Sequence, residues 1–192
     1  MKNSIYILLI SMIIFGCNNS KKETLESPQE NIDYEEIGLN YAFITKKELG
    51  KNLMGTIKNK GVNSAVAFCN ERAYFITDSI STSFNAKIKR VSDKPRNSDN
   101  AANKKELNHI ETFKDMLTNE QEMKPILEEN GTTVNFYYPI ITNDMCLQCH
   151  GTENNEMKSN VYKTIKALYP LDQAIGYGDN QVRGIWSISF EK

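Results

Sequence analysis

Two cysteines and a histidine near the C-terminal end are the residues of this chain best suited to chemistry. In the stretch MCLQCHG, residues 145–151, Cys146 and Cys149 are three positions apart and His150 follows directly. Cys-x-x-Cys-His is the attachment pattern of c-type haem. Two sulfurs at this spacing can form thioethers with the two vinyl groups of the porphyrin, and the adjoining imidazole can bind the iron. The pattern therefore predicts one covalent haem c, attached through Cys146 and Cys149 and ligated by His150.

Three other chemistries use the same residue types. A thioredoxin-like dithiol places Cys-x-x-Cys at the start of an apolar helix, whereas the polar stretch GTENNEMKSN, residues 151–160, follows the motif here. A zinc site needs four ligands, so the three motif residues would need help from Cys69 or His109. A disulfide within the motif would close a strained loop. The spacing and the adjoining histidine favour haem over these alternatives.

A haem iron held by His150 has a second axial position to fill. Cys69 lies in the middle of an apolar helical stripe, so its thiol should face the core. A buried free cysteine can also be a chemically inert core residue, which is the alternative for Cys69. His109 lies at the margin of another apolar face and can equally be a partly exposed helix residue. Met116, Met123 and Met157 are further candidates, although methionine commonly fills cores. The residue pattern leaves Cys69 and His109 as nearly equal choices.

Alternating and helical apolar patterns indicate the elements that position these residues. Helices are predicted at 34–57, 62–80, 101–118, 120–129 and 161–170, and strands at 86–91, 132–141 and 182–192. Gly61 is expected to separate the first two helices, and Asn130-Gly131 is typical of a helix end. Leu107 is expected on the buried side of the helix at 101–118. Helices flanking a small antiparallel sheet make an α+β domain.

The N-terminus is typical of an exported lipoprotein. The apolar run Ile5–Phe15 is too short for a membrane span and suits a signal peptide; it ends in a stretch that resembles a lipobox, with Cys17 as the lipidated residue. We expect a signal peptide at 1–17, a flexible polar tether at 18–31 and the haem domain at 32–192. A cleaved signal with an incidental Cys17, or an uncleaved anchor, is the alternative. This predicts a lipid-anchored protein on the periplasmic side of a bacterial membrane or at the cell surface.

The composition agrees with a soluble domain and excludes one class of partner. The chain has 23 basic and 24 acidic residues, and 40% of its residues are hydrophobic. No charge of one sign dominates, so nucleic acid is not an expected partner.

Several ordered segments resemble a family of single-haem c-type domains with a PAS-like fold. The family includes sensor regions of bacterial signalling proteins and small stand-alone cyanobacterial cytochromes. The matching segments are AFCNERA (67–73), RVSDKPRNSDN (90–100), Glu106, YYPIITNDMCLQCHG (137–151) and YPLDQAIGYGDNQVRGIWSI (169–188). The resemblance implies a PAS-like domain with His150 as the proximal ligand and Cys69 as the distal ligand. Arg90 and Arg96 could pair with the haem propionates or be solvated loop charges.

The resemblance also bears on function. Two axial ligands from the protein would leave no open position for a substrate, and a thiolate ligand predicts a low reduction potential. We therefore expect an electron carrier, or a sensor of redox state or a small gas, that works with a separate redox or signalling partner rather than as an enzyme. A haem enzyme of the peroxidase type and a non-haem zinc or dithiol lipoprotein are the alternative classes.

Overall fold

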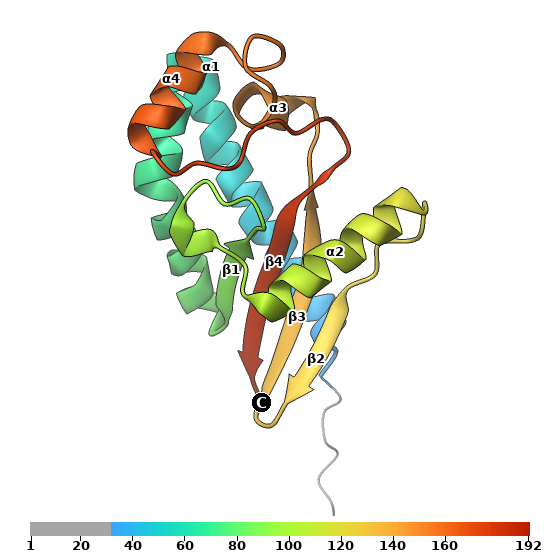
Figure 1. The fold of residues 1–192 in the computed structure, drawn as a ribbon. Helices are drawn as coiled ribbons and strands as arrows, with labels where there is room; N and C mark the ends of the chain where they lie inside the picture. The colour runs from blue at the N-terminus through green and yellow to red at the C-terminus, as the bar shows by residue number, and fades with distance from the viewer. Residues whose placement is uncertain (1–31) are drawn as a thin grey trace, which may run out of the picture. The chain divides into compact units, whose positions relative to one another are not determined.

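Four antiparallel strands form the sheet on which the rest of the domain is built (Figure 1). The strands are β1 (Lys87–Val91), β2 (Ile126–Asn130), β3 (Thr133–Ile141) and β4 (Val182–Glu191), in the order β1-β4-β3-β2. The structure is a computed structural model that describes residues 32–192. The predicted signal peptide, the lipidation site Cys17 and the tether lie outside the described residues.

A long helical element, α1 (Tyr34–Phe84), covers one face of the sheet. It begins at Asp33, whose side chain accepts hydrogen bonds from two backbone amides of the first turn. Gly61 interrupts it with a non-helical backbone (φ 80°, ψ 171°), which confirms the predicted break. Tyr41, near the start, stacks on Phe84, at the end, with ring centroids 4.1 Å apart. The two segments of α1 therefore double back on each other, as Figure 1 shows.

A second helix, α2 (Lys104–Thr118), covers the other face. Its residues Ile110 and Phe113 are fully buried and pack with Tyr137 of β3. The neighbouring Phe136 packs instead on the α1 side, because successive side chains of a strand point to opposite faces. Leu107, predicted on the buried side of α2, is 38% exposed.

Two short helices stand at one end of the sheet. Helix α3 (Asp144–His150) follows β3, and α4 (Ser159–Leu168) packs against the second segment of α1 through Val66, Val161 and Ile165. A single turn, η1 (Ser98–Asn100), lies in the loop after β1. This α+β arrangement, a small antiparallel sheet with helices on both faces, is the predicted PAS-like fold. None of the helices between residues 32 and 192 is long and apolar enough to cross a membrane.

One predicted helix is wrong. Residues 120–129 were expected to be helical, but Ile126–Asn130 form β2 and pair with β3 in a hairpin. Pro125 lacks the backbone N–H that a helix interior requires. Asn130 pairs with Thr133, so the Asn-Gly pair that resembled a helix end opens a tight turn, where Gly131 has φ of 57°. Such a left-handed residue is typical of short hairpin loops.

Candidate cofactor site

The Cys-x-x-Cys-His motif is the helix α3 itself. Asn143 caps this helix, because its side chain accepts a hydrogen bond from the backbone N–H of Cys146. The buried side chain of Leu147 holds the short helix against the domain. In a helix, residues three apart share a face, so Cys146 and Cys149 lie on one side. Both cysteines and His150 are half-buried as whole residues.

His150 is held in one tautomer by a backbone carbonyl. Its Nδ1 lies 2.7 Å from the carbonyl oxygen of Ala174, and a carbonyl can only accept, so Nδ1 carries the proton and donates. Arg183 Nε, which can only donate, is 3.3 Å from the same nitrogen; the carbonyl contact is the shorter of the two, so we assign the proton to Nδ1. The lone pair is therefore on Nε2, which is the usual arrangement for a metal-binding histidine.

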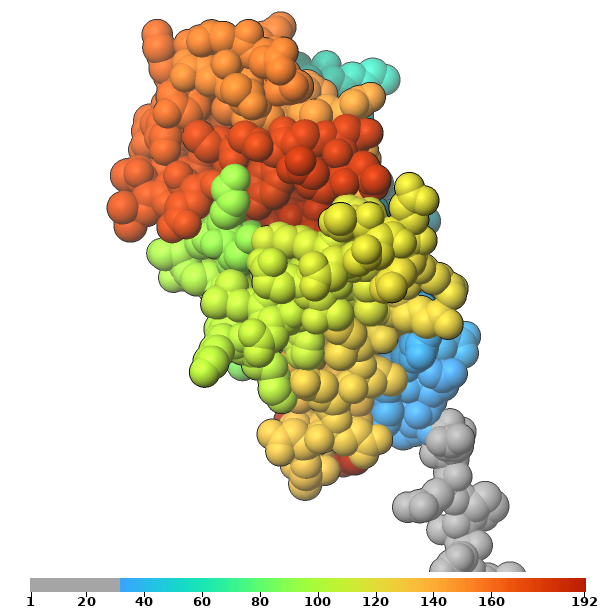
Figure 2. Space-filling view, turned by 45° about the vertical axis from the view of Figure 1, so that its right-hand side comes forward, coloured from blue at the N-terminus to red at the C-terminus, as the bar shows by residue number. Residues whose placement is uncertain are grey.

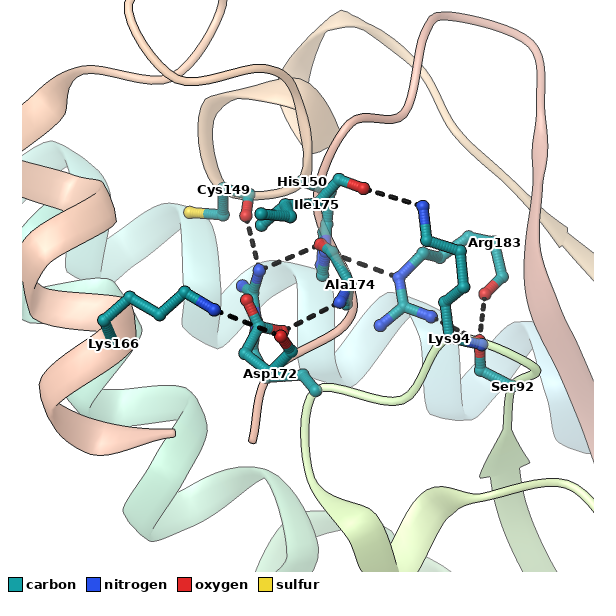
Figure 3. Close-up of polar contacts among 10 residues, drawn as sticks. Ser92, Lys94, Cys149, His150, Lys166, Asp172, Ala174, Ile175 and Arg183 are labelled. Atoms are coloured by element: carbon teal, nitrogen blue, oxygen red, sulfur yellow. Dashed lines mark hydrogen bonds and ion pairs between the residues drawn. The ribbon is translucent and has the colours of Figure 1, made fainter. Parts of the chain in front are cut away.

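The charge state of His150 also suits metal binding. Desolvation by burial, followed by the charges of Arg96 and Arg183, holds the pKa of His150 well below its ordinary value. The imidazole is consequently neutral at neutral pH, which is the form that ligates metals. Figure 3 shows His150 and Ala174 together, with Arg183 on one side and Cys149 on the other.

The other predicted site residues gather at this point from distant parts of the chain. Cys69 comes from the second segment of α1, and Arg90 comes from β1. Burial raises the pKa of the Cys69 thiol, and the nearby charges of Arg90 and Arg96 oppose that rise. The neighbours that act on Cys149 include Arg96, Cys69 and Cys146. The structure thus brings Cys69, Arg90 and Arg96 close to the motif.

The arginines divide into one that is paired with a carboxylate and two that are not. Arg96 donates to Asp172 at 3.1 Å, to the Cys149 carbonyl at 2.6 Å and to the Ala174 carbonyl at 3.0 Å. Among residues 32–192, no carboxylate lies within ion-pair distance of Arg90 or Arg183. Burial lowers the pKa of both groups. The site therefore holds two desolvated cations without an anion.

Arg183 is the site residue that the sequence reasoning missed. It occupies a half-buried position near the start of β4, a strand whose other residues are almost all buried. Its guanidinium donates to the Ser92 hydroxyl at 2.7 Å and lies beside His150. A lone basic residue in a strand that is otherwise almost entirely buried was the signal that could have identified it.

The segment between α4 and β4, residues 170–181, lies over the motif and is called the strap here. Its backbone bonds directly to the end of the motif: Gly176 N–H donates to Gly151 O at 3.0 Å and Tyr177 N–H donates to His150 O at 2.9 Å. Figure 2 shows the strap (red) at the surface, between α4 (orange) and α2 (yellow-green). Asp172, Ala174 and Tyr177 are buried, whereas Leu171 is 76% exposed. The strap is the element that supplies the acceptor for His150.

His109 lies elsewhere. It is on α2, with Nε2 3.3 Å from Glu128 of β2 and its ring centroid 4.3 Å from that of Tyr137. This is the face of the sheet opposite α1, so the sheet separates His109 from Cys69. Met116 and Met123 pack on the α2 side as well. Met157 is fully buried in the cluster that includes Cys149, so it is the one candidate methionine near the motif.

The geometry bears differently on the zinc and dithiol alternatives. Within residues 32–192, no group of three or more His, Cys, Asp or Glu side chains is arranged to hold a metal ion. The motif does occupy a helix directly after a strand, as a redox dithiol does. A redox dithiol lowers the pKa of its first cysteine, whereas the residue whose pKa burial raises to about 11 here is Cys149, the second cysteine of the motif.

This pKa can be tested on the haem-free chain. In a Cys69→Ser, Cys146→Ser variant, where Cys149 is the only thiol among the described residues, alkylation should be slow at pH 8. The rate should rise with an apparent pKa of about 11, because the reactive thiolate forms only there. Iodoacetamide labelling followed by peptide mass spectrometry measures it, and the urea-unfolded chain is the control. A pKa at or below that of the unfolded chain would contradict the burial of the Cys149 thiol.

The comparisons with known proteins agree with this geometry. A model of the Tll0287-like family matches residues 18–191. No curated protein matches the chain. Among solved structures, the crystal structure of the cyanobacterial heme-protein Tll0287 matches with a TM-score of 0.60 and 18% identity, over 84% of this chain and 98% of that chain. Identity at this level supports the shared fold, while the family model spans nearly the whole sequence. The chain belongs to the Tll0287-like family.

Proposed function

We propose that this chain is an exported, lipid-anchored monohaem c-type cytochrome. Cys146 and Cys149 would hold the porphyrin through thioethers, and His150 and Cys69 would bind the iron. The observation that carries the proposal is the 2.7 Å contact between His150 Nδ1 and Ala174 O: with the proton assigned to Nδ1, Nε2 is the nitrogen left to bind a metal. The name of the solved relative, a heme-protein, supports the same cofactor.

The unpaired arginines fit the cofactor as well. A haem carries two propionate carboxylates, and Arg90 and Arg183 are two guanidiniums without a carboxylate partner in the described part of the chain. Charge-assisted pairs between guanidinium and carboxylate are strong and geometrically specific. The sequence pointed to Arg90 and Arg96 for this role. Because Arg96 is already bonded to Asp172 and two carbonyls, we assign the propionate role to Arg90 and Arg183 instead.

The ligand set favours electron transfer or sensing over catalysis. When bound, the haem supplies one-electron redox chemistry at the iron. With Cys69 and His150 both ligating, no axial position is open to a substrate. The only other histidine, His109, is on the opposite face of the sheet, so it cannot act as the acid–base group that a peroxidase needs. A thiolate ligand favours ferric iron and a low reduction potential. A PAS-like fold adds weight to sensing by analogy alone.

Covalent attachment is the first test. The full chain, produced in a bacterium that matures c-type cytochromes, should carry one haem that survives denaturing electrophoresis and adds its mass to the polypeptide. Replacing both Cys146 and Cys149 with alanine should remove the stain, because no thioether can form. Cys69→Ala should keep it, since that thiol is not an attachment point. A colourless wild-type chain of apoprotein mass would overturn the proposal, and turnover of peroxide would favour the enzyme class.

The distal ligand has its own spectroscopic test. Ferric wild-type protein should show the low-spin paramagnetic resonance signature of a thiolate ligand, and Cys69→Ala should lose it and gain a more positive potential, because the anionic donor is gone. His109→Ala, on the far face of the sheet, should leave both measurements unchanged. Met157→Leu is the second comparison. If Met157→Leu abolishes the wild-type spectrum while Cys69→Ala preserves it, the iron is bound by methionine.

The anchor is tested by fractionation. Full-length chain should sediment with membranes and carry a lipid on its N-terminal residue after processing, whereas Cys17→Ala should leave the membrane fraction with its haem content unchanged. Fractionation with immunoblotting and intact-mass measurement gives the result. Equal membrane association of the two proteins would contradict lipidation at Cys17.

A further inference from the structure

Asp172 is a buried carboxylate whose position needs an explanation. Its side chain is 0% exposed, and its Oδ1 accepts from Arg96 Nε at 3.1 Å and from the backbone N–H of Ala174 at 2.9 Å. Its Oδ2 is buried without a hydrogen-bond partner among the described residues. A half-satisfied buried charge is unfavourable unless it is closely paired. A buried apolar residue at position 172 would therefore carry a smaller desolvation cost than this carboxylate.

The ion pair between Asp172 and Arg96 fixes two backbone carbonyls that flank His150, one directly before it in the chain and one in the strap. The same Nη2 of Arg96 donates to Cys149 O at 2.6 Å and to Ala174 O at 3.0 Å. Cys149 directly precedes His150, and Ala174 O accepts the Nδ1–H of its ring. Asp172 fixes the position of Arg96 and, through Ala174 N–H, the peptide next to the acceptor. One carboxylate thus positions the backbone before the histidine and the oxygen that orients its ring.

We propose that Asp172 and Arg96 act together as the positioning pair for His150 as an iron ligand. The inference rests on the proposed haem function and adds a role for two residues that do not touch the iron. The strap stays attached to the motif through Gly176 and Tyr177, so loss of the pair would shift the Ala174 carbonyl without releasing the whole segment. The His150 Nδ1–H would then lose a fixed acceptor. Outer partners of this kind orient metal-bound histidines and strengthen their donation to the metal.

The test compares holoprotein variants. Asp172→Asn keeps the side-chain size and an acceptor for Ala174 N–H, but it removes the charge that holds Arg96. Arg96→Lys keeps a positive charge and loses the forked geometry. With haem content equal to wild type, both variants should show changed ferric g-values and a shifted reduction potential. Added imidazole should displace His150 from the iron at roughly 10–100-fold lower concentration than in wild type. The double variant should be no worse than either single variant, because the two residues act as a unit.

Two comparisons separate positioning from general stability. Asp172→Glu should recover part of the wild-type spectrum. Glu128→Gln breaks an ion pair with Lys105 on the far face of the sheet and should leave the spectrum and potential unchanged. In the haem-free chain, nitrogen NMR of His150 should show a mixture of tautomers in Asp172→Asn and one tautomer in wild type. If both variants only lower the melting temperature, with wild-type spectra, potential and tautomer, the inference fails. A wild-type chain without haem would instead refute the proposed function.

Discussion

The hydrogen bond between His150 Nδ1–H and the Ala174 carbonyl determines what the motif can do. It selects the tautomer, and so it leaves Nε2 as the nitrogen that can bind a metal. The carbonyl belongs to the strap, which is distant in sequence from α3 and reaches it only after α4 has packed on α1. The chemistry of the motif therefore depends on a contact made by the folded chain, although the residue types alone already predict covalent attachment.

The four-stranded sheet organises the rest by dividing the molecule into two faces. On the α1 side, Cys69 and Arg90 approach α3. On the α2 side, His109 is engaged with Glu128 and Tyr137. The two histidines have different surroundings, because His150 contacts Ala174 and Arg183 beside the strap. Of the two residues that the sequence left as choices for the second axial position, the structure places Cys69, and not His109, beside the motif.

The charges at the site are also set by which distant elements meet there. Three arginines converge, and Asp172 balances one of them by binding Arg96 at 3.1 Å. Burial makes the remaining two guanidiniums unfavourable by themselves, as the lowered pKa values of Arg90 and Arg183 indicate. A dianionic cofactor would stabilise both. In this arrangement the Asp172–Arg96 ion pair would position His150, and Arg90 and Arg183 would remain for the carboxylates of the cofactor.

The sequence alone determined the local features. Cys-x-x-Cys-His, the break at Gly61 and the alternating strands 86–91, 132–141 and 182–192 all depend on neighbours in the chain, and local patterns predict them well. Local patterns gave a wrong prediction where one sequence pattern suits two structures. Asn130-Gly131 can end a helix or begin a hairpin turn, and the pairing of residues 126–130 with β3 determined that it is a hairpin turn. The neighbours of Cys69 and His109, the partners of Arg96 and the place of Arg183 were decided by the tertiary structure. These depend on which faces of distant elements meet, and periodicity cannot specify that because it records burial and not the partner.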